Sequence, residues 1–505
     1  MKLKYLAALL VLTGMPLLSG RAMQTNVPAT TLAELQQRLT ELVSQPKFDA
    51  GILGVKVISS RSGKTLFEHD AGKLFSPASN CKLYTVALAL DRLGADYRLK
   101  TSLYAAAKPA PNGTLKGDVI VYGRGDPGFN GRSKSNDLFL ALEPLVTALA
   151  NAGVKRITGD LVGDESFFQG PPYGSGWDAD DLQYYYGAEI SALTLNDNIL
   201  KLTAKPGARV GASCRLTLEP NTDYVVVSNR TTTAAVGGKR DLQCYRPLGQ
   251  NVIYVTGQWP LNDIEHTEFV TVHRPAGLFL AIFREALARR GIKVEGRLRT
   301  VNWLEREAEP LDWGRLVELG SVQSEPLRVI ARDIMKPSQN LYTDLLLAHI
   351  GALALATNAA PGKTSEAAGI EQLNNFLERV GIDKGEAYFE EGSGLSRNNL
   401  ATPRATIALL NFMSRHPAAA VFRESLPVAG VDGTLRTRMR NTAAAGNVRA
   451  KTGTLRWANS LSGYVTTAAG EPLIFCIMVN REDGPVRETI DDITVQLAEF
   501  AARSE

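Results

Sequence analysis

The 505-residue chain is poor in cysteine and histidine, with four of the first and five of the second. Four cysteines in a chain of this length exclude a small disulfide-stapled scaffold. The histidines (His69, His266, His273, His349 and His416) are scattered and include no H-x-x-x-H pair, which disfavours a zinc peptidase. A G-x-S-x-G segment is also missing, which argues against an α/β-hydrolase. The sequence therefore predicts no metal and no cofactor.

The chain also lacks a strong charge imbalance, an internal repeat and a low-complexity tract. Its 56 basic and 52 acidic residues leave a net charge of +4, too small an excess for a nucleic-acid binder. Lys2, Lys4 and Arg21 lie in an N-terminal segment without acidic residues, so the chain after it has 53 basic residues against 52 acidic ones. The hydrophobic share of 44% is ordinary for a globular protein, and the length suits about three domains.

Long hydrophobic runs are absent after the first 22 residues. There, two lysines precede an apolar stretch at residues 5–18, and small residues precede a cleavage site after Ala22. This layout is typical of a secretory signal peptide, with an uncleaved anchor as the alternative. We therefore expect an exported protein of the periplasm or cell-wall space, with no integral membrane segment after signal removal. In such a compartment Cys214 and Cys244 can pair, but spacing alone does not decide whether they do.

The pattern along the chain changes twice. Helical and strand patterns alternate up to about residue 97, with a helix at 31–43, strands at 54–58 and 65–68, and a helix from 83 that stops at Gly94. Residues 98–315 are β-rich, with one clear helix near 278–290. Helical patterns return at 326–356 and 371–380, followed by strands at 447–455, 460–467 and 472–480 and a helix at 491–502. The sequence thus predicts an α/β domain split by a β-rich insertion.

Three short motifs carry chemistry. Residues 79–82 form an S-x-x-K at the start of a helix, which places Lys82 one helical turn from Ser79. Residues 338–340 form an S-x-N, which by itself is read more simply as a helix N-cap. Residues 451–454 hold a K-T-G in a predicted strand, where a glycine permits close approach of an extended peptide. Each motif is weak alone, but in this order they are the serine-acylating set of penicillin-binding proteins and β-lactamases.

With these motifs the sequence resembles the D-alanyl-D-alanine carboxypeptidase/endopeptidases of the penicillin-binding protein 4 type, the class C low-molecular-mass penicillin-binding proteins. Residues 76–79, 191–198, 392–400 and 426–435 also carry the resemblance, which spans essentially the whole mature chain. The 259 positions from Ser79 to Ser338 exceed what a single-domain β-lactamase has, and the family resembled is known for such an insertion.

The resemblance implies an α/β (α+β) penicillin-binding-protein-like transpeptidase fold, related to serine β-lactamases. It consists of an antiparallel sheet flanked by helices, with a large β-rich insertion forming one or two extra domains. The expected division is a signal peptide at 1–22, a split catalytic domain at 25–97 and 316–505, an inserted domain II at 98–178 and 260–315, and an inserted domain III at 179–259.

The resemblance also implies roles for the catalytic residues. Ser79 attacks the carbonyl of the D-Ala-D-Ala bond, and Lys82, with a lowered pKa, acts as general base. Ser338 and Lys451 relay a proton to the leaving amine, and Asn340 holds the substrate amide. Which lysine is the base is disputed in such enzymes and stays open here.

Two further groups of residues bind substrate under this reading. Lys451, Thr452 and Thr454 receive the terminal carboxylate, and Gly453 permits close approach of the substrate backbone. The backbone N–H groups of Ser79 and Thr454 form the oxyanion hole. An accessory pocket for the zwitterionic end of diaminopimelate is formed by four residues, Asp181, Tyr186, Arg397 and Arg436. The alternative for that pocket is a solvated acidic loop with exposed arginines.

Three positions depart from the usual family pattern. Gln339 stands where Asp is common, Glu391 stands where Asp is usual, and Arg436 stands where a neutral amide can occur. None of them removes a reacting group, but the last two leave the fine substrate preference open.

The expected function is a serine-type D-Ala-D-Ala carboxypeptidase, with DD-endopeptidase activity in addition, that hydrolyses peptidoglycan stem peptides and is blocked covalently by β-lactams. A β-lactamase or esterase with the same site, and a non-catalytic wall-binding module, are the alternatives. The sequence leaves open the balance of the two peptidase activities, the third stem-peptide residue, partner proteins and whether the chain forms a homo-oligomer.

Overall fold

The computed structural model describes residues 27–132, 137–358, 360–482, 484 and 486–503. The predicted signal peptide, with Lys2, Lys4 and Arg21, lies outside the described residues. Within them, no helix has both the length and the apolar character needed to cross a bilayer.

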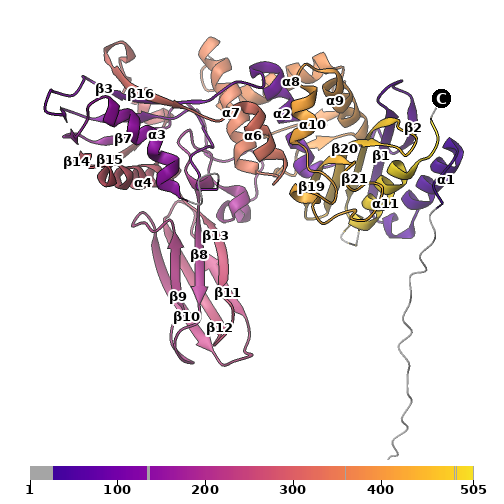
Figure 1. Ribbon diagram of the computed structural model, residues 1–505, viewed down its shortest axis with the longest axis horizontal. Coiled ribbons are helices and arrows are strands. Elements are labelled where there is room, and N and C mark those ends of the chain that lie inside the picture. Colours follow the sequence, from indigo (N-terminus) through magenta and orange to yellow (C-terminus); the bar gives the residue numbers. More distant parts are fainter. Residues whose placement is uncertain (1–26, 133–136, 359, 483, 485, 504–505) are drawn as a thin grey trace, which may run out of the picture.

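A five-stranded antiparallel sheet brings the two ends of the chain together (Figure 1). Its order is β19 (Arg449–Leu455), β20 (Ala458–Thr466), β21 (Pro472–Asn480), β1 (Ile52–Ser59) and β2 (Thr65–His69). β1 pairs along its whole length with β21, so the N-terminal hairpin completes a sheet begun by the C-terminal strands. The elements that the sequence predicts at both ends therefore belong to one sheet.

Helices cover both faces of this sheet. Along β21, Leu473, Phe475 and Ile477 face one hydrophobic core and Ile474 and Cys476 face the other, as the two-residue period of a strand requires. The first core contains α1 (Leu32–Val43) and α11 (Val486–Glu499). The second contains α2 (Cys81–Leu93), α6 (Leu327–Met335), α7 (Asn340–Thr357), α8 (Ser365–Val380), α9 (Pro403–Arg415) and α10 (Ala419–Ser425). Burial on both faces explains why the strand sequences are almost continuously apolar.

The β-rich region between α2 and α6 begins with a mixed sheet of parallel and antiparallel strands. Its order is β15 (Leu298–Val301), β7 (Leu161–Asp164), β5 (Val119–Tyr122), β3 (Lys100–Ala105) and β16 (Val317–Gln323). A small sheet of β14 (Lys293–Val294), β6 (Arg156–Ile157) and β4 (Thr114–Leu115) lies beside it, with helices α3 (Leu138–Asn151) and α4 (Pro275–Arg289). The short α5 (Trp303–Ala308) and the two-stranded ribbon β17 (Ala387–Tyr388) and β18 (Leu400–Ala401) complete the regular elements outside the next unit.

Two three-stranded sheets project away from the rest of the molecule in Figure 1. One is ordered β13 (His266–Thr271), β8 (Ile199–Lys205) and β9 (Arg215–Glu219), and the other β10 (Val226–Ala234), β12 (Val252–Pro260) and β11 (Asp241–Tyr245). We call these two sheets the projecting sheets. They share a hydrophobic core with α3 and α4. β13 pairs with β8 across the boundary expected at residue 259, and the division into domains II and III stays a prediction.

The structure adds two helices to this region and answers the question of the Cys214–Cys244 pair, which the sequence left open. The helix expected near residues 278–290 is α4, and the region contains two further helices, α3 and α5. α3 is apolar on most of its surface and contains Pro144, so its sequence does not show a helical period, yet Asp137 caps its first turn and Leu142 packs into the shared core. The Cys214–Cys244 bridge is absent, because the four cysteines are free thiols.

The chain path explains the unpaired cysteines. Cys214 precedes β9 of one projecting sheet, and its carbonyl accepts a hydrogen bond from Asn229 of β10 at 2.8 Å. Cys244 lies in β11, and β12 stands between β10 and β11. A whole strand therefore separates Cys244 from the neighbour of Cys214.

Candidate active site

Ser79 lies in a 3₁₀ turn, η2 (Ala78–Asn80), that leads directly into α2. The turn is pinned to the central sheet, because Ser460 donates to the carbonyl of Pro77 at 2.8 Å. Gly453 of β19 allows this close approach, since a Cβ there would lie 2.5 Å from the Pro77 carbonyl oxygen. The K-T-G strand can therefore run beside the serine only with glycine at this position.

Lys82 contacts Ser79 directly. Its Nζ lies 3.0 Å from Ser79 Oγ, 2.7 Å from Asn340 Oδ1 and 2.5 Å from the carbonyl oxygen of Ser393. The side chain is fully buried. Burial lowers the pKa of Lys82 to about 8, although the negative charge of Glu391 works in the opposite direction. A neutral amine able to accept the Ser79 proton is therefore populated near neutral pH.

Ser338 and Lys451 form a second hydrogen-bonded pair in the site. Lys451 Nζ lies 2.8 Å from Ser338 Oγ and 2.7 Å from the carbonyl oxygen of Thr452. Burial, and then the charge of Lys82, hold the pKa of Lys451 well below its usual range. Ser338 is not the N-cap of α7, because Gln339 occupies that position. Ser338 precedes the N-cap and has a left-handed φ of 66°.

A cavity of about 1670 Å³ opens above these residues. Its lining includes the following predicted site residues: Ser79, Ser338, Asn340, Thr452, Thr454, Asp181, Tyr186 and Arg397. Lys82 and Lys451 are buried beneath it. The structure thus collects residues from both halves of the catalytic domain and from the insertion around one space.

Asp181 and Tyr186 come from two 3₁₀ turns of the insertion, η3 (Ala179–Gln183) and η4 (Tyr185–Gly187). Burial, and then the charge of Asp181, raise the pKa of Tyr186 to about 12. Burial, and then the charge of Asp178, raise the pKa of Asp181, while Arg397 opposes the shift. Arg397 lies 3.3 Å from Asp178 and also donates to the carbonyl of Arg456 at 3.0 Å. A carboxylate and a guanidinium therefore flank the same part of the cavity.

The structure does not bring Arg436 to this cavity. Thr434, two residues earlier, lines it, and Leu435 of η7 (Gly433–Leu435) is buried. Arg436 follows the turn on the exposed side, where its carbonyl accepts a hydrogen bond from Arg440 at 2.9 Å. Of the two exposed residues that flank Leu435, Thr434 therefore reaches the cavity and Arg436 does not.

Glu391 and Asp344 are two buried carboxyl groups near Lys82 that the sequence analysis did not place in the site. Glu391 accepts hydrogen bonds from the backbone N–H groups of Ser393 and Gly394, each at 2.7 Å, and so holds the Ser393 carbonyl that contacts Lys82. Asp344 accepts from the N–H of Gly392 at 3.0 Å. Burial, followed by the charge of Glu391, raises the pKa of Asp344 well above its usual value. The four-residue spacing from Asn340 to Asp344 on α7 was the one available signal.

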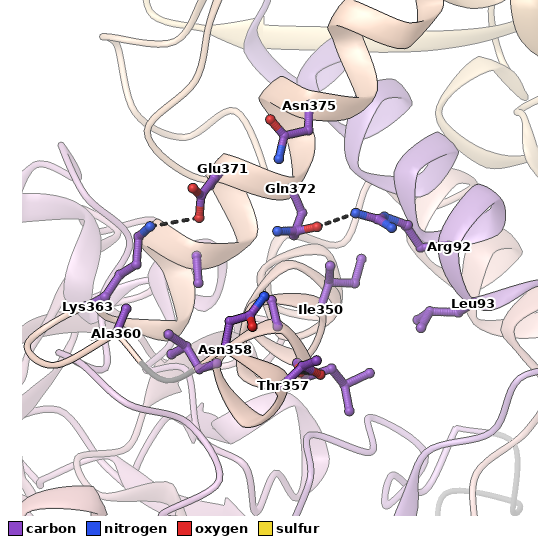
Figure 2. A pocket seen from close by; sticks show the side chains of 14 residues that line it. Arg92, Leu93, Ile350, Thr357, Asn358, Ala360, Lys363, Glu371, Gln372 and Asn375 are labelled. Carbon is purple, nitrogen blue, oxygen red and sulfur yellow. Dashed lines mark hydrogen bonds and ion pairs between the residues drawn. The ribbon is translucent and has the colours of Figure 1, made fainter.

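A second cavity, of about 680 Å³, lies between α2, α7 and α8 and shares no lining residue with the first (Figure 2). Its charged groups are paired: Arg92 with Gln372, and Lys363 with Glu371 at 2.7 Å. Among the described residues, no cluster of His, Cys, Asp and Glu is arranged to hold a metal ion. The reactive side chains therefore converge on the Ser79 cavity.

Comparison with known proteins gives a consistent result. The model of the D-Ala-D-Ala carboxypeptidase 3 (S13) family matches residues 35–502. A D-alanyl-D-alanine carboxypeptidase of Actinomadura sp. (strain R39) is 33% identical over 499 residues, covering 96% of this chain and 88% of that protein. DacB of Haemophilus influenzae, also a D-alanyl-D-alanine carboxypeptidase, is 26% identical over 432 residues, covering 82% of each.

The fold is also found among solved structures. The crystal structure of penicillin binding protein 4 from Haemophilus influenzae superposes with a TM-score of 0.77 at 24% identity, covering 94% of this chain and 100% of that one. The expected penicillin-binding-protein-like fold is thereby confirmed.

Proposed function

The chain belongs to the D-Ala-D-Ala carboxypeptidase 3 (S13) family, and from that premise we propose how its residues divide the work of a serine D-Ala-D-Ala carboxypeptidase. Ser79 is the nucleophile, and it forms an acyl-enzyme with the penultimate D-Ala while the terminal D-Ala leaves. The observation that carries this assignment is the contact of Lys82 Nζ with Ser79 Oγ at 3.0 Å, made by a buried lysine.

Lys82 is the general base for acylation. Its neutral form accepts the Ser79 proton as Oγ attacks the carbonyl carbon, and Asn340 Oδ1, at 2.7 Å, holds the amine in place. Lys451 contacts Ser338 rather than Ser79, which supports a role for this pair in passing a proton to the leaving amine. The two lysines thus act on opposite ends of the bond that breaks.

The substrate lies along β19. This strand is at the edge of the central sheet. Its start is covered, because the Ala450 N–H donates to the Pro427 carbonyl at 3.0 Å, but Thr452 and Thr454 line the cavity, where an extended peptide can lie along the strand. In that position the scissile carbonyl oxygen receives the backbone N–H groups of Ser79 and Thr454, and the hydroxyls of Thr452 and Thr454 with the charge of Lys451 receive the terminal carboxylate. The site is a ready acceptor for a β-lactam, whose ring carbonyl replaces the peptide carbonyl and leaves Ser79 acylated.

The peptide substrate carries diaminopimelate at its third position. Asp181 faces the ammonium and Arg397 faces the carboxylate of its side-chain end, with the Tyr186 hydroxyl beside them. A cavity of about 1670 Å³ is larger than the roughly 300–1,000 Å³ typical of small-ligand sites, and this supports endopeptidase action on cross-linked peptides as well. Residues 1–22 direct export, which places the enzyme in the periplasm or cell-wall space with its substrate.

One experiment tests the assignment. The mature chain is incubated with a fluorescent penicillin and, separately, with a diaminopimelate pentapeptide, alongside Ser79→Ala and the exposed-turn control Ser62→Ala. A long-lived adduct and release of D-Ala are expected for the wild type and for Ser62→Ala, and both are lost in Ser79→Ala. Absence of any adduct in the wild type would support a wall-binding module, and rapid turnover of the drug without D-Ala release would support a β-lactamase.

A further inference from the structure

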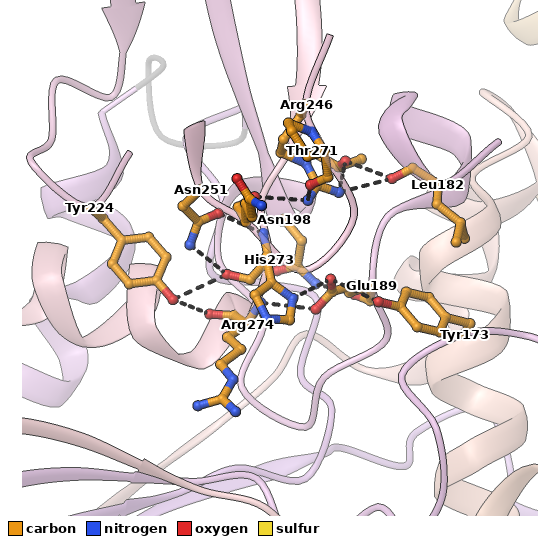
Figure 3. A network of polar contacts seen from close by, with 12 residues as sticks. Tyr173, Leu182, Glu189, Asn198, Tyr224, Arg246, Asn251, Thr271, His273 and Arg274 are labelled. Carbon is orange, nitrogen blue, oxygen red and sulfur yellow. Dashed lines mark hydrogen bonds and ion pairs between the residues drawn. The ribbon is translucent and has the colours of Figure 1, made fainter. Parts of the chain in front are cut away.

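The segment of residues 182–189 links the active site to the projecting sheets. Figure 3 shows its two ends, Leu182 and Glu189, among their polar contacts. It contains Tyr186, whose carbonyl oxygen accepts a hydrogen bond from Asn340 Nδ2 at 2.9 Å. The other end of the same amide, Asn340 Oδ1, contacts Lys82 Nζ. A shift of the Tyr186 backbone therefore changes the orientation of a side chain that touches the general base.

The first anchor of this segment is Arg246, which follows β11. The side chain is only 2% exposed, and its Nη2 donates to the carbonyl of Leu182 at 3.1 Å and to Thr271 Oγ1 at 3.0 Å. Thr271, the last residue of β13, donates to the same Leu182 carbonyl at 2.8 Å. Two residues of the projecting sheets thus hold one backbone oxygen, next to Asp181 in the chain.

Burial of Arg246 has a cost that packing alone does not offset. A buried guanidinium loses its hydration. Its other hydrogen-bond partners are the carbonyls of Gln250, at 3.1 Å, and Pro247, at 3.3 Å, and the charge of Glu189 offsets part of the effect of burial on its pKa. Among the described residues, Arg246 Nε has no hydrogen-bond partner. An apolar side chain here would leave four oxygen acceptors without the Arg246 donor, the Leu182 carbonyl among them.

A second anchor holds the other end of the segment. Glu189 is buried, and its carboxylate contacts His273 Nδ1 at 2.8 Å and accepts from the Arg274 N–H at 2.9 Å, both just beyond β13. Between the anchors, Tyr184 forms an antiparallel bridge with Val270 of β13. The segment that carries Tyr186 is therefore tied to the β13 region at both ends and in the middle.

We propose that Arg246 and Thr271 are positioning residues that fix segment 182–189 over the active site, so that the projecting sheets control selection of the diaminopimelate side chain. The inference rests on the proposed function, because it assigns a purpose to the Asp181–Tyr186 pocket. Loosening the Leu182 anchor displaces Asp181 and Tyr186 from the substrate. Lys82 is affected less, because it keeps its contacts with Ser79 Oγ and the Ser393 carbonyl when Asn340 shifts. Recognition of the third peptide residue is then weakened more than the acylation chemistry.

The test uses Arg246→Met and Thr271→Val in the full mature chain. Two pentapeptides, with diaminopimelate or alanine at the third position, are compared by D-Ala release. We expect the preference for diaminopimelate in kcat/KM to fall about tenfold in each variant, mainly through KM. The effects should be less than additive in the double variant, since both act on the Leu182 carbonyl.

Arg306→Met is the matched control. Arg306 donates to buried Asp164 at 2.8 Å. Asp164 ends β7 of the mixed five-stranded sheet, so loss of this contact destabilises that sheet without touching segment 182–189. We expect it to lower the melting temperature but to leave the substrate preference unchanged. Thr271→Val nearly preserves shape and carries the test if Arg246→Met fails to fold.

Two results distinguish the possible failures. Suppose that the wild type releases D-Ala. If the preference between the two peptides is then unchanged in Arg246→Met and Thr271→Val, or falls equally in Arg306→Met, the positioning role alone is overturned. A wild type that neither releases D-Ala nor forms a penicillin adduct would instead overturn the proposed function.

Discussion

The protonation state of Lys82 determines how the acylation rate depends on pH. Its pKa is lowered to about 8 because the amine is buried. With that value, roughly a tenth of the lysine is neutral at about pH 7 and half at about pH 8, so the rate should rise about fivefold across this interval and level off by about pH 9. The assay is the second-order rate constant for acylation by a fluorescent penicillin, measured by stopped flow across this range.

Two matched variants identify the groups that set this pKa. Glu391→Gln removes a negative charge that favours the protonated amine, so the rising limb should move to lower pH. Asp344→Asn should move the limb in the same direction but by less, because the charge of Asp344 raises the pKa of Lys82 less than that of Glu391 does. Its amide oxygen can still accept from the Gly392 N–H.

A rate independent of pH from about pH 6 to pH 9 would refute the assignment of Lys82 as the titrating base. A limb that shifts more in Asp344→Asn than in Glu391→Gln would contradict the order in which the two carboxyl groups act on Lys82. Circular dichroism at each pH value verifies that the variants remain folded.

Three further predictions follow from the same geometry. The pKa of Lys82 is lower in the folded chain than in the unfolded one, so the unfolded state binds more protons between about pH 8 and pH 10.5. The free energy of unfolding should therefore rise with pH over this range by about 3 kcal/mol from this group. The slope of unfolding free energy against pH should flatten in Lys82→Met. Gly453→Ala should reduce the rate of penicillin acylation at least about tenfold, because the added methyl group meets the turn that carries Ser79. The control Gly314→Ala should leave the rate unchanged, since the nearest atom to its added methyl group is a carboxylate oxygen at 3.3 Å. Normal acylation in Gly453→Ala would contradict the close approach of the two segments. Arg397→Gln should raise KM for a diaminopimelate peptide about tenfold, and Arg436→Gln should change it less than about twofold, with the reverse order showing that Arg436 reaches the substrate.

The central sheet and its helices could be predicted from the sequence because their signals are local. The apolar strands at residues 472–480 and 460–467 and the glycine stop at Gly94 depend on neighbouring residues only, and they match β21, β20 and the end of α2. α3 was missed because its helical face is set by the core it packs against, and its own sequence is apolar almost throughout.

The site was predictable as far as its side chains occur in recognisable motifs. Contacts made by the backbone carbonyls of Ser393 and Tyr186 have no sequence signature, since any residue presents a carbonyl group. The same limit applies to Arg436, whose distance from the cavity depends on the direction of one turn. Glu391 was noticed only as a departure from a pattern, and its contacts with the Ser393–Gly394 backbone supply the physical reason for an acidic residue there.

The central claim is that Ser79 is acylated with the help of Lys82. Its most direct test is mass spectrometry of the mature chain after brief exposure to benzylpenicillin, with digestion to locate the adduct. The account predicts a single penicilloyl group on the peptide that contains Ser79, and its loss in Lys82→Met with Ser79 still present. An adduct on another residue, or undiminished acylation of Ser79 in Lys82→Met, would contradict it.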